Sequence, residues 1–138
     1  MQLLDSNDKY VLKIDKKRKI VYEKPIGYWK PEDIERLHKD YLNKVLPLLR
    51  GNKDTINWAK CVDLRGYKLS MILDKLQDHV KWAVSNGFKK GVIIVDLGNE
   101  NCKVLELQMK TSTKDTSVIP KVFYNVEDGL NWLKKYGF

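Results

Sequence analysis

Residues 61–70 read CVDLRGYKLS and mark the point at which a predicted strand passes into a predicted helix. The segment 56–64 is largely apolar and rich in residues that favour strands, which is typical of a strand covered inside a sheet. A short turn with one glycine follows, and Ser70 stands directly before an amphipathic stretch over residues 72–86. Apolar residues recur there at helical spacing, so the sequence predicts a strand, a turn and a helix in succession.

The chain downstream of this turn continues the alternation of predicted strands and helices. Residues 91–95 (GVIIV) are the most strand-like segment, and they end, like the earlier strand, at an aspartate. A helix that begins after Asn99 or Asn101 is predicted next, and Pro120 gives the strand predicted over residues 118–124 an edge position. Asn125 is the expected N-cap of the last helix.

The chain upstream of the turn begins with a predicted hairpin. Residues 10–14 and 20–23 alternate apolar with polar side chains, which predicts two antiparallel strands joined by a polar turn. The breaker segment PIGYWKP (25–31) follows, and its last residue, Pro31, suits the first turn of a helix. Pro47 should kink this helix or begin a separate last turn, because proline cannot complete the helical hydrogen bonds.

The predicted order is therefore strand-strand-helix-strand-helix-strand-helix-strand-helix. It predicts an α/β fold in which a hairpin joins a mixed, mostly parallel sheet of about five strands through right-handed crossovers. The chain has 138 residues, and we expect residues 1–138 to form one domain. The strands that end near Asp63 and Asp96 should share one edge of the sheet, where ligands and partners generally gather.

The composition narrows the class of protein. Apolar residues make up 43% of the chain and charged residues 32%, a globular balance. The net charge of +8 comes mainly from scattered lysines, and the dense run at residues 16–19 falls at the hairpin tip, which disfavours a nucleic-acid partner. The N-terminus lacks the pattern of a signal peptide, and the apolar runs are too short to span a membrane. Two isolated cysteines predict neither a zinc site nor a disulfide framework, and a cytoplasmic location is expected.

Two stretches placed in this order resemble the STAS domain, and more narrowly its SpoIIAA-like branch of anti-sigma-factor antagonists. Residues 60–70 (KCVDLRGYKLS) look like the central strand, turn and helix start of that family, and residues 125–138 (NVEDGLNWLKKYGF) look like its ending. The resemblance covers essentially the whole chain. It implies a small bacterial regulator that binds a protein partner and catalyses no reaction.

In the antagonists this turn carries a serine in an Asp-Ser-Ser-Gly-like motif, and phosphorylation of the serine breaks binding to the anti-sigma factor. Asp63 and Gly66 fit the general Asp-Leu-x-Gly strand ending, whereas the Asp-Ser-Ser-Gly motif itself is absent. Ser70 is the only serine near its place. Two interpretations follow for Ser70: an N-cap of the next helix, or a phosphoacceptor beside Arg65 and Lys68.

Other residue types that carry chemistry are present without a recognisable catalytic arrangement. Asp63 and Asp96 could serve as metal ligands or an acid–base pair, but we expect both to accept hydrogen bonds from turn amides, since no phosphate-cradling loop is present. A dyad of Cys102 with His38 or His79 lacks a third orienting group. We therefore expect no enzyme, no metal and no cofactor.

The predicted function is a regulatory or protein–protein interaction module. The aromatic residues of the 25–31 loop either form a contact surface or pocket, or cover the core as a lid. The alternative function is a carrier or sensor of a small molecule or lipid, with an enclosed cavity near that loop. The predicted binding residues are Arg65, Gly66, Tyr67, Lys68 and Ser70 of the turn, with Tyr28 and Trp29 of the loop.

Overall fold

The computed structural model describes residues 1–138 and contains one six-stranded sheet with the spatial order β1-β2-β3-β4-β5-β6. The pairs β1–β2 and β2–β3 are antiparallel, and the next three pairs are parallel. The expected α/β fold with a mixed, mostly parallel sheet is confirmed. The strands are β1 (Gln2–Ser6), β2 (Tyr10–Asp15), β3 (Ile20–Pro25), β4 (Trp58–Asp63), β5 (Phe88–Ile94) and β6 (Lys121–Phe123).

The helices alternate with the parallel strands as the sequence predicts. Three crossovers connect β3 to β4, β4 to β5 and β5 to β6, and each steps the sheet in the same direction. Right-handed crossovers that step the same way place their helices on one face of a sheet. The helices are α1 (Pro31–Asp40), the π-helical segment η1 (Tyr41–Val45), α2 (Leu46–Arg50), α3 (Leu73–Ser85), α4 (Cys102–Ser112) and α5 (Val126–Lys134).

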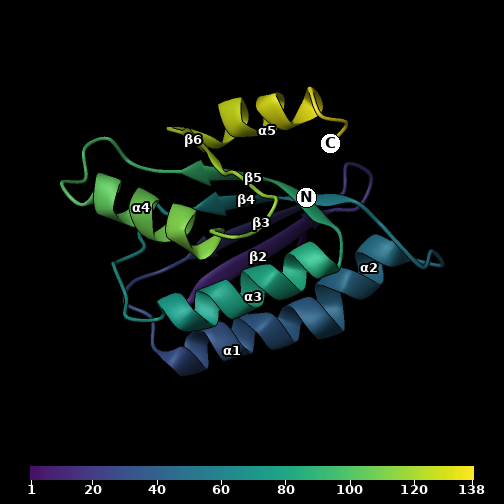
Figure 1. The fold of residues 1–138 in the computed structure, drawn as a ribbon, viewed down its shortest axis with the longest axis horizontal. Coiled ribbons are helices and arrows are strands. Elements are labelled where there is room, and N and C mark those ends of the chain that lie inside the picture. The colour runs from purple at the N-terminus through teal and green to yellow at the C-terminus, as the bar shows by residue number, and fades with distance from the viewer.

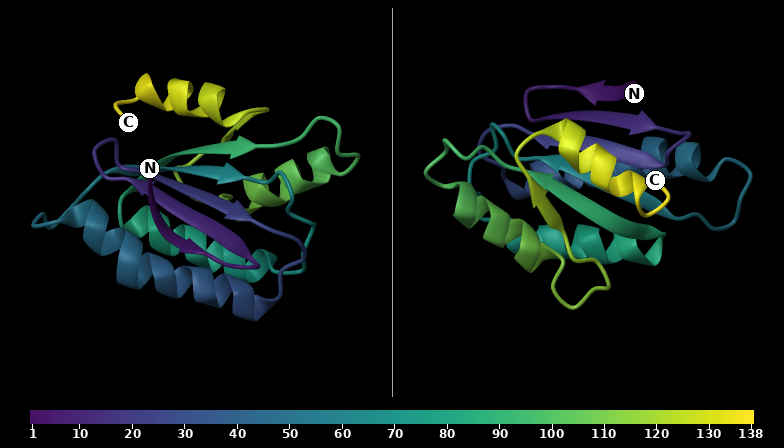
Figure 2. Two further views of the ribbon diagram at one scale, coloured as in Figure 1. Left: turned by 180° about the vertical axis from the view of Figure 1, so that it is seen from behind. Right: turned by 90° about the horizontal axis from the view of Figure 1, so that it is seen from above.

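The two faces of the sheet are therefore covered by different numbers of helices. Helices α1, α3 and α4 lie on one face, and α5 alone lies on the other, as Figures 1 and 2 show. The larger core lies beneath the first group and includes Leu12, Trp58 and Ile93, whereas the smaller core around Cys61 and Leu133 lies beneath α5. Strand β4 is covered on both faces, which explains the nearly continuous apolar character of its sequence.

Strand β1 is a correction to the predicted count of about five strands. Its residues lie at the sheet edge, and none of them is fully buried. A bulge between Leu3 and Asp5 interrupts its pairing with β2. An exposed edge strand is held mainly by backbone hydrogen bonds to its neighbour, so its sequence carries little apolar alternation. The missed strand extends the predicted hairpin into a three-stranded antiparallel unit.

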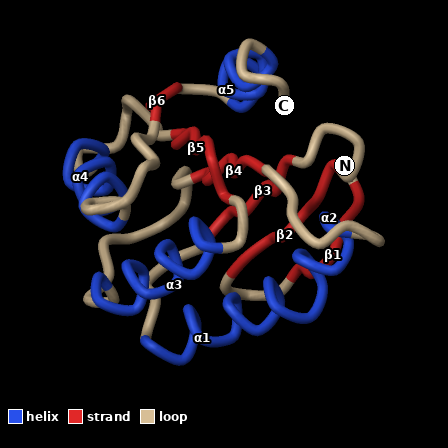
Figure 3. Tube along the Cα trace, turned by 45° about the vertical axis from the view of Figure 1, so that its right-hand side comes forward, coloured by secondary structure: helices blue, strands red, loops and turns tan.

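Several predicted element ends are confirmed. Pro31 stands at the start of α1, and Pro47 lies in the first turn of the separate helix α2, after the π-helical segment. Asn125 caps α5 by accepting a hydrogen bond from the Asp128 amide. Strand β6 follows Pro120 and is the edge strand opposite β1, as the tube in Figure 3 makes visible. None of the helices combines the length and apolar character that crossing a bilayer requires.

Candidate functional site

The two predicted binding segments lie side by side at the carboxyl edge of the sheet. The Gly27 amide donates a hydrogen bond to the Gly66 carbonyl oxygen at 2.8 Å, and the Lys68 amide donates one to the Gly27 carbonyl oxygen at 3.0 Å. These bonds form a short parallel bridge between Gly27 and Tyr67. The Tyr28–Trp29 loop and the 65–70 turn, which the sequence treats as separate candidates, therefore form one structural unit.

Ser70 ties these two loops together and is not an N-cap. Its hydroxyl accepts a hydrogen bond from the Trp29 amide at 2.8 Å and donates one to the Lys68 carbonyl oxygen at 2.7 Å. Helix α3 begins only at Leu73, and no side chain caps it. The N-cap prediction is wrong because the turn continues for two residues past Ser70. The side chain is buried, so a kinase could reach its oxygen only if the loops separated.

Asp63 anchors the start of the turn. The guanidinium of Arg65 donates to both carboxylate oxygens at 2.9 Å, and the Tyr22 hydroxyl donates to one of them at 2.7 Å. Burial alone would raise the pKa of Asp63, but these hydrogen bonds outweigh it and hold that pKa below its usual value. Both aspartates also accept from turn amides, Asp63 from Arg65 and Asp96 from Gly98, as predicted.

The predicted binding residues divide into buried and exposed members. Trp29 and Tyr67 are 2% exposed and pack in the larger core, where the Tyr67 hydroxyl donates to the Gln108 side chain at 2.7 Å. Gly66 has a φ of +104°, a conformation that glycine adopts readily. Tyr28, Arg65 and Lys68 remain accessible. We define the edge surface as these three residues together with the exposed Leu69 and Met71.

The edge surface borders a hollow of about 450 Å³ between the starts of α1 and α3, lined in part by Pro31, Met71 and Leu73. Met71 is 90% exposed, and Leu97 in the next strand-to-helix loop is 66% exposed. Large apolar side chains that gather at one edge of a soluble domain are typical of a contact surface.

A second group, on the inner face of the sheet, was missed by sequence reasoning. The Lys60 ammonium of β4 lies 3.1 Å from the Glu23 carboxylate of β3, which also accepts a hydrogen bond from the Tyr41 hydroxyl. Lys60 Nζ lies 2.9 Å from His79 Nε2, and His79 Nδ1 lies 2.9 Å from His38 Nδ1. We call these five residues the buried polar chain. All of them except His38 are buried.

The pKa values of the chain reflect its burial. Burial lowers the pKa of Lys60, while the neighbouring Glu23 acts in the opposite direction. Burial, together with the charge of Lys60, also lowers the pKa of both histidines, and that of His79 lies well below its ordinary value. The lowered pKa values leave the histidines neutral at pH 7. The ion pair of the chain is that of Lys60 with Glu23.

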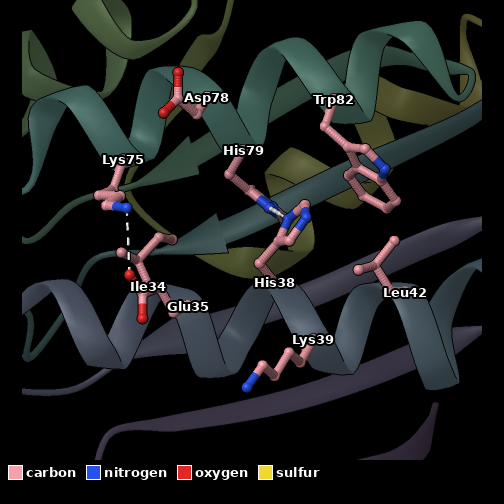
Figure 4. Close-up of a pocket in the computed structure, with 9 residues that line it drawn as sticks. All are labelled: Ile34, Glu35, His38, Lys39, Leu42, Lys75, Asp78, His79 and Trp82. Atoms are coloured by element: carbon pink, nitrogen blue, oxygen red, sulfur yellow. Dashed lines mark hydrogen bonds and ion pairs between the residues drawn. The ribbon is translucent and has the colours of Figure 1, made fainter.

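The buried polar chain ends at a cavity of about 400 Å³ between α1 and α3. Figure 4 shows His38 of α1 and His79 of α3 pointing toward one another, with Trp82 beside them. An ion pair between Lys75 and Glu35 at 3.2 Å crosses from one helix to the other. The remaining lining residues are Ile34, Lys39, Leu42 and Asp78. The sequence showed both histidines in mid-helix, but only the packing of two helices pairs them; neither is hydrogen-bonded to Cys102.

No protein-family model and no curated protein sequence matches the chain. Among solved structures, the chain resembles one from the crystal structure of the diguanylate cyclase SiaD in complex with its activator SiaC from Pseudomonas aeruginosa. The likeness has a TM-score of 0.57 at 13% sequence identity, and it covers 91% of this chain and 100% of that one. At 13% identity, this likeness shows a shared fold alone.

Proposed function

We propose that this chain is a non-enzymatic regulatory module that binds a protein partner through the edge surface. The observation that carries the proposal is the exposure of Tyr28, Leu69 and Met71 on loops that are hydrogen-bonded to each other and to the core. A rigid loop loses little conformational entropy on binding, so its exposed apolar side chains contribute efficiently to affinity. Aromatic residues and methionine are enriched at the centre of protein interfaces.

The charges of the edge surface indicate the kind of partner. Lys68 lies beside the apolar side chains, Arg65 is paired with Asp63, and the chain as a whole carries a net charge of +8. An acidic partner would associate faster with such a surface, because complementary charge steers the encounter. We therefore propose a partner whose contact face combines an apolar centre with an acidic rim.

The solved structure with a similar fold supports this class of function by analogy. In it, an activator is bound to the enzyme that it activates. The STAS-like sequence features extend the proposal to a bacterial cytoplasmic regulator of the anti-sigma-factor antagonist kind. Function is decided by sites and not by folds, so the edge surface has to be tested directly.

The test compares two exposed apolar residues at opposite ends of the sheet. Met71 is 90% exposed in the edge surface, and Ile119, just before β6, is 84% exposed. Tagged wild type should capture a defined partner from source-cell lysate. Met71→Glu and Lys68→Glu should reduce the partner recovered by about tenfold, whereas Ile119→Glu should leave it unchanged.

Circular dichroism should show that all three variants remain folded. The proposal would be wrong if Met71→Glu captured as much partner as the wild type, or if Ile119→Glu lost the partner equally. Failure of the wild type to retain any protein would also contradict it.

A further inference from the structure

We infer that the cavity between α1 and α3 is a binding site for a small aromatic carboxylate, with His38 as the hydrogen-bond donor to the ligand. The inference concerns a surface distinct from the edge surface and does not depend on the proposed protein partner. It also moves the expected small-molecule site away from Tyr28 and Trp29, which do not line this cavity.

The hydrogen bonds of the buried polar chain determine which nitrogen of each histidine carries a proton. The Lys60 ammonium can only donate, so His79 Nε2, at 2.9 Å from it, must accept. The proton of neutral His79 then lies on Nδ1, which donates to His38 Nδ1 at 2.9 Å. His38 must therefore carry its own proton on Nε2.

This arrangement gives the cavity a polarised donor. His38 Nε2 makes no hydrogen bond to the protein, and His38 lines the cavity. Each donor in a hydrogen-bonded chain strengthens the next, so the positive charge of Lys60 makes the Nε2 proton of His38 a better donor to an anion. A carboxylate oxygen is the acceptor that gains most from such a donor.

The walls of the cavity select for an aromatic ligand. His38 packs edge-on against Trp82 with ring centroids 4.8 Å apart, and His79 stacks on the same indole at 5.8 Å. Ile34 and Leu42 add apolar surface. Aromatic rings favour such stacked and edge-on neighbours, and a volume of about 400 Å³ lies within the range of small-molecule sites.

The stability of the fold does not by itself explain the buried polar chain. Buried ion pairs contribute less than well-packed apolar residues of similar size, because both charges lose their hydration. Here the pair of Lys60 and Glu23 connects through two histidines to a cavity, where perturbed ionisable groups are typical of functional sites. A role in ligand binding accounts for a buried ion pair that stability alone does not explain.

The experiment uses benzoate as the probe. The chain has only two histidines, so an NMR spectrum of the imidazole nitrogens reports on His38 and His79 alone. Benzoate should bind the full chain by isothermal titration calorimetry and shift the His38 Nε2 resonance. Benzylamine, which offers a cation instead of an anion, should bind at least about tenfold more weakly.

Three variants separate the donor from general effects. His38→Leu removes the donor and should weaken benzoate binding by about tenfold or more, the loss expected for one charge-assisted hydrogen bond. His38→Gln keeps an N–H donor and should retain part of the affinity. Lys103→Ala changes an exposed residue of α4 outside the cavity and should bind like the wild type.

The inference would be overturned if benzoate and benzylamine bound equally, if neither bound, or if His38→Leu bound benzoate as the wild type does. Met71→Glu should leave benzoate binding intact, so a failure of the edge surface and a failure of this site are distinguishable. Spectra of each variant should match the wild type outside the cavity, which shows that lost binding does not reflect lost folding.

Discussion

Replacing Lys60 by methionine tests whether the buried polar chain is held together by its ion pair. Lys60 is 4% exposed, its ammonium lies 3.1 Å from Glu23, and it also lies 4.3 Å from the centre of the Tyr41 ring. Methionine has a similar length and no charge. The variant therefore leaves the Glu23 carboxylate buried without its counter-ion, and it removes the donor to His79.

The expected loss is large on the scale of a small domain. Removal of one partner from a buried ion pair costs about 3–5 kcal/mol, because the remaining charge has lost its hydration without compensation. A domain of this size is stable by about 5–15 kcal/mol in total. Lys60→Met should therefore lower the free energy of unfolding by roughly a fifth or more of that stability.

A double variant separates charge from packing. Glu23→Gln combined with Lys60→Met removes both charges and keeps an oxygen that can accept from Tyr41. Replacing both members of a buried pair is often nearly neutral, so the double variant should regain most of the lost stability.

Urea denaturation followed by tryptophan fluorescence and circular dichroism measures these free energies. The reasoning would be refuted if Lys60→Met lost less than about 1 kcal/mol, the typical cost of a point substitution. It would also be refuted if the double variant were no more stable than Lys60→Met. Either result would mean that the ion pair is solvated in solution.

Three further predictions concern the edge of the sheet and one turn. Ser70→Ala should cost about 1–3 kcal/mol in urea denaturation, because the buried Trp29 amide loses its acceptor. The pKa of Asp63 is lower in the folded chain than in the unfolded one, so its carboxylate stabilises the fold at neutral pH and this contribution is lost as the pH falls. Arg65→Met removes hydrogen bonds that lower this pKa, and it should therefore raise the pH midpoint of acid unfolding measured by circular dichroism. Gly87→Ala should lower the melting temperature, with a cost above about 1 kcal/mol, because φ is +101° and a Cβ would meet a backbone carbonyl oxygen at 1.7 Å.

Local signals predicted most of the elements. The helical spacing over residues 72–86 and the apolar run at residues 91–95 correspond to α3 and β5. Pro31 begins α1 and Pro47 lies in the first turn of α2, as predicted. These features depend on neighbours in the chain, so the sequence displays them directly. Strand β1 was missed because its pairing with β2 supplies most of what holds it in place.

Ser70 shows where local reasoning fails. A serine directly before an amphipathic stretch is a normal N-cap signal. The hydroxyl is instead used by the Trp29 amide, 41 residues away in the chain, and the helix starts later. A long-range hydrogen bond in a buried site outcompeted the local cap, and no pattern within the turn indicates it.

The sequence by itself determined the order of strands and helices from β2 onward, the mixed sheet and the edge at which Asp63 and Asp96 follow their strands. Apolar periodicity and turn residues specify these features within short windows. The tertiary structure alone decided the buried polar chain, since Glu23, His38, Lys60 and His79 come from β3, α1, β4 and α3. These four residues come into contact only through the strand register and the way in which two helices cross the sheet. Burial then gives the contacts their chemistry, because charges and imidazoles removed from water must satisfy one another.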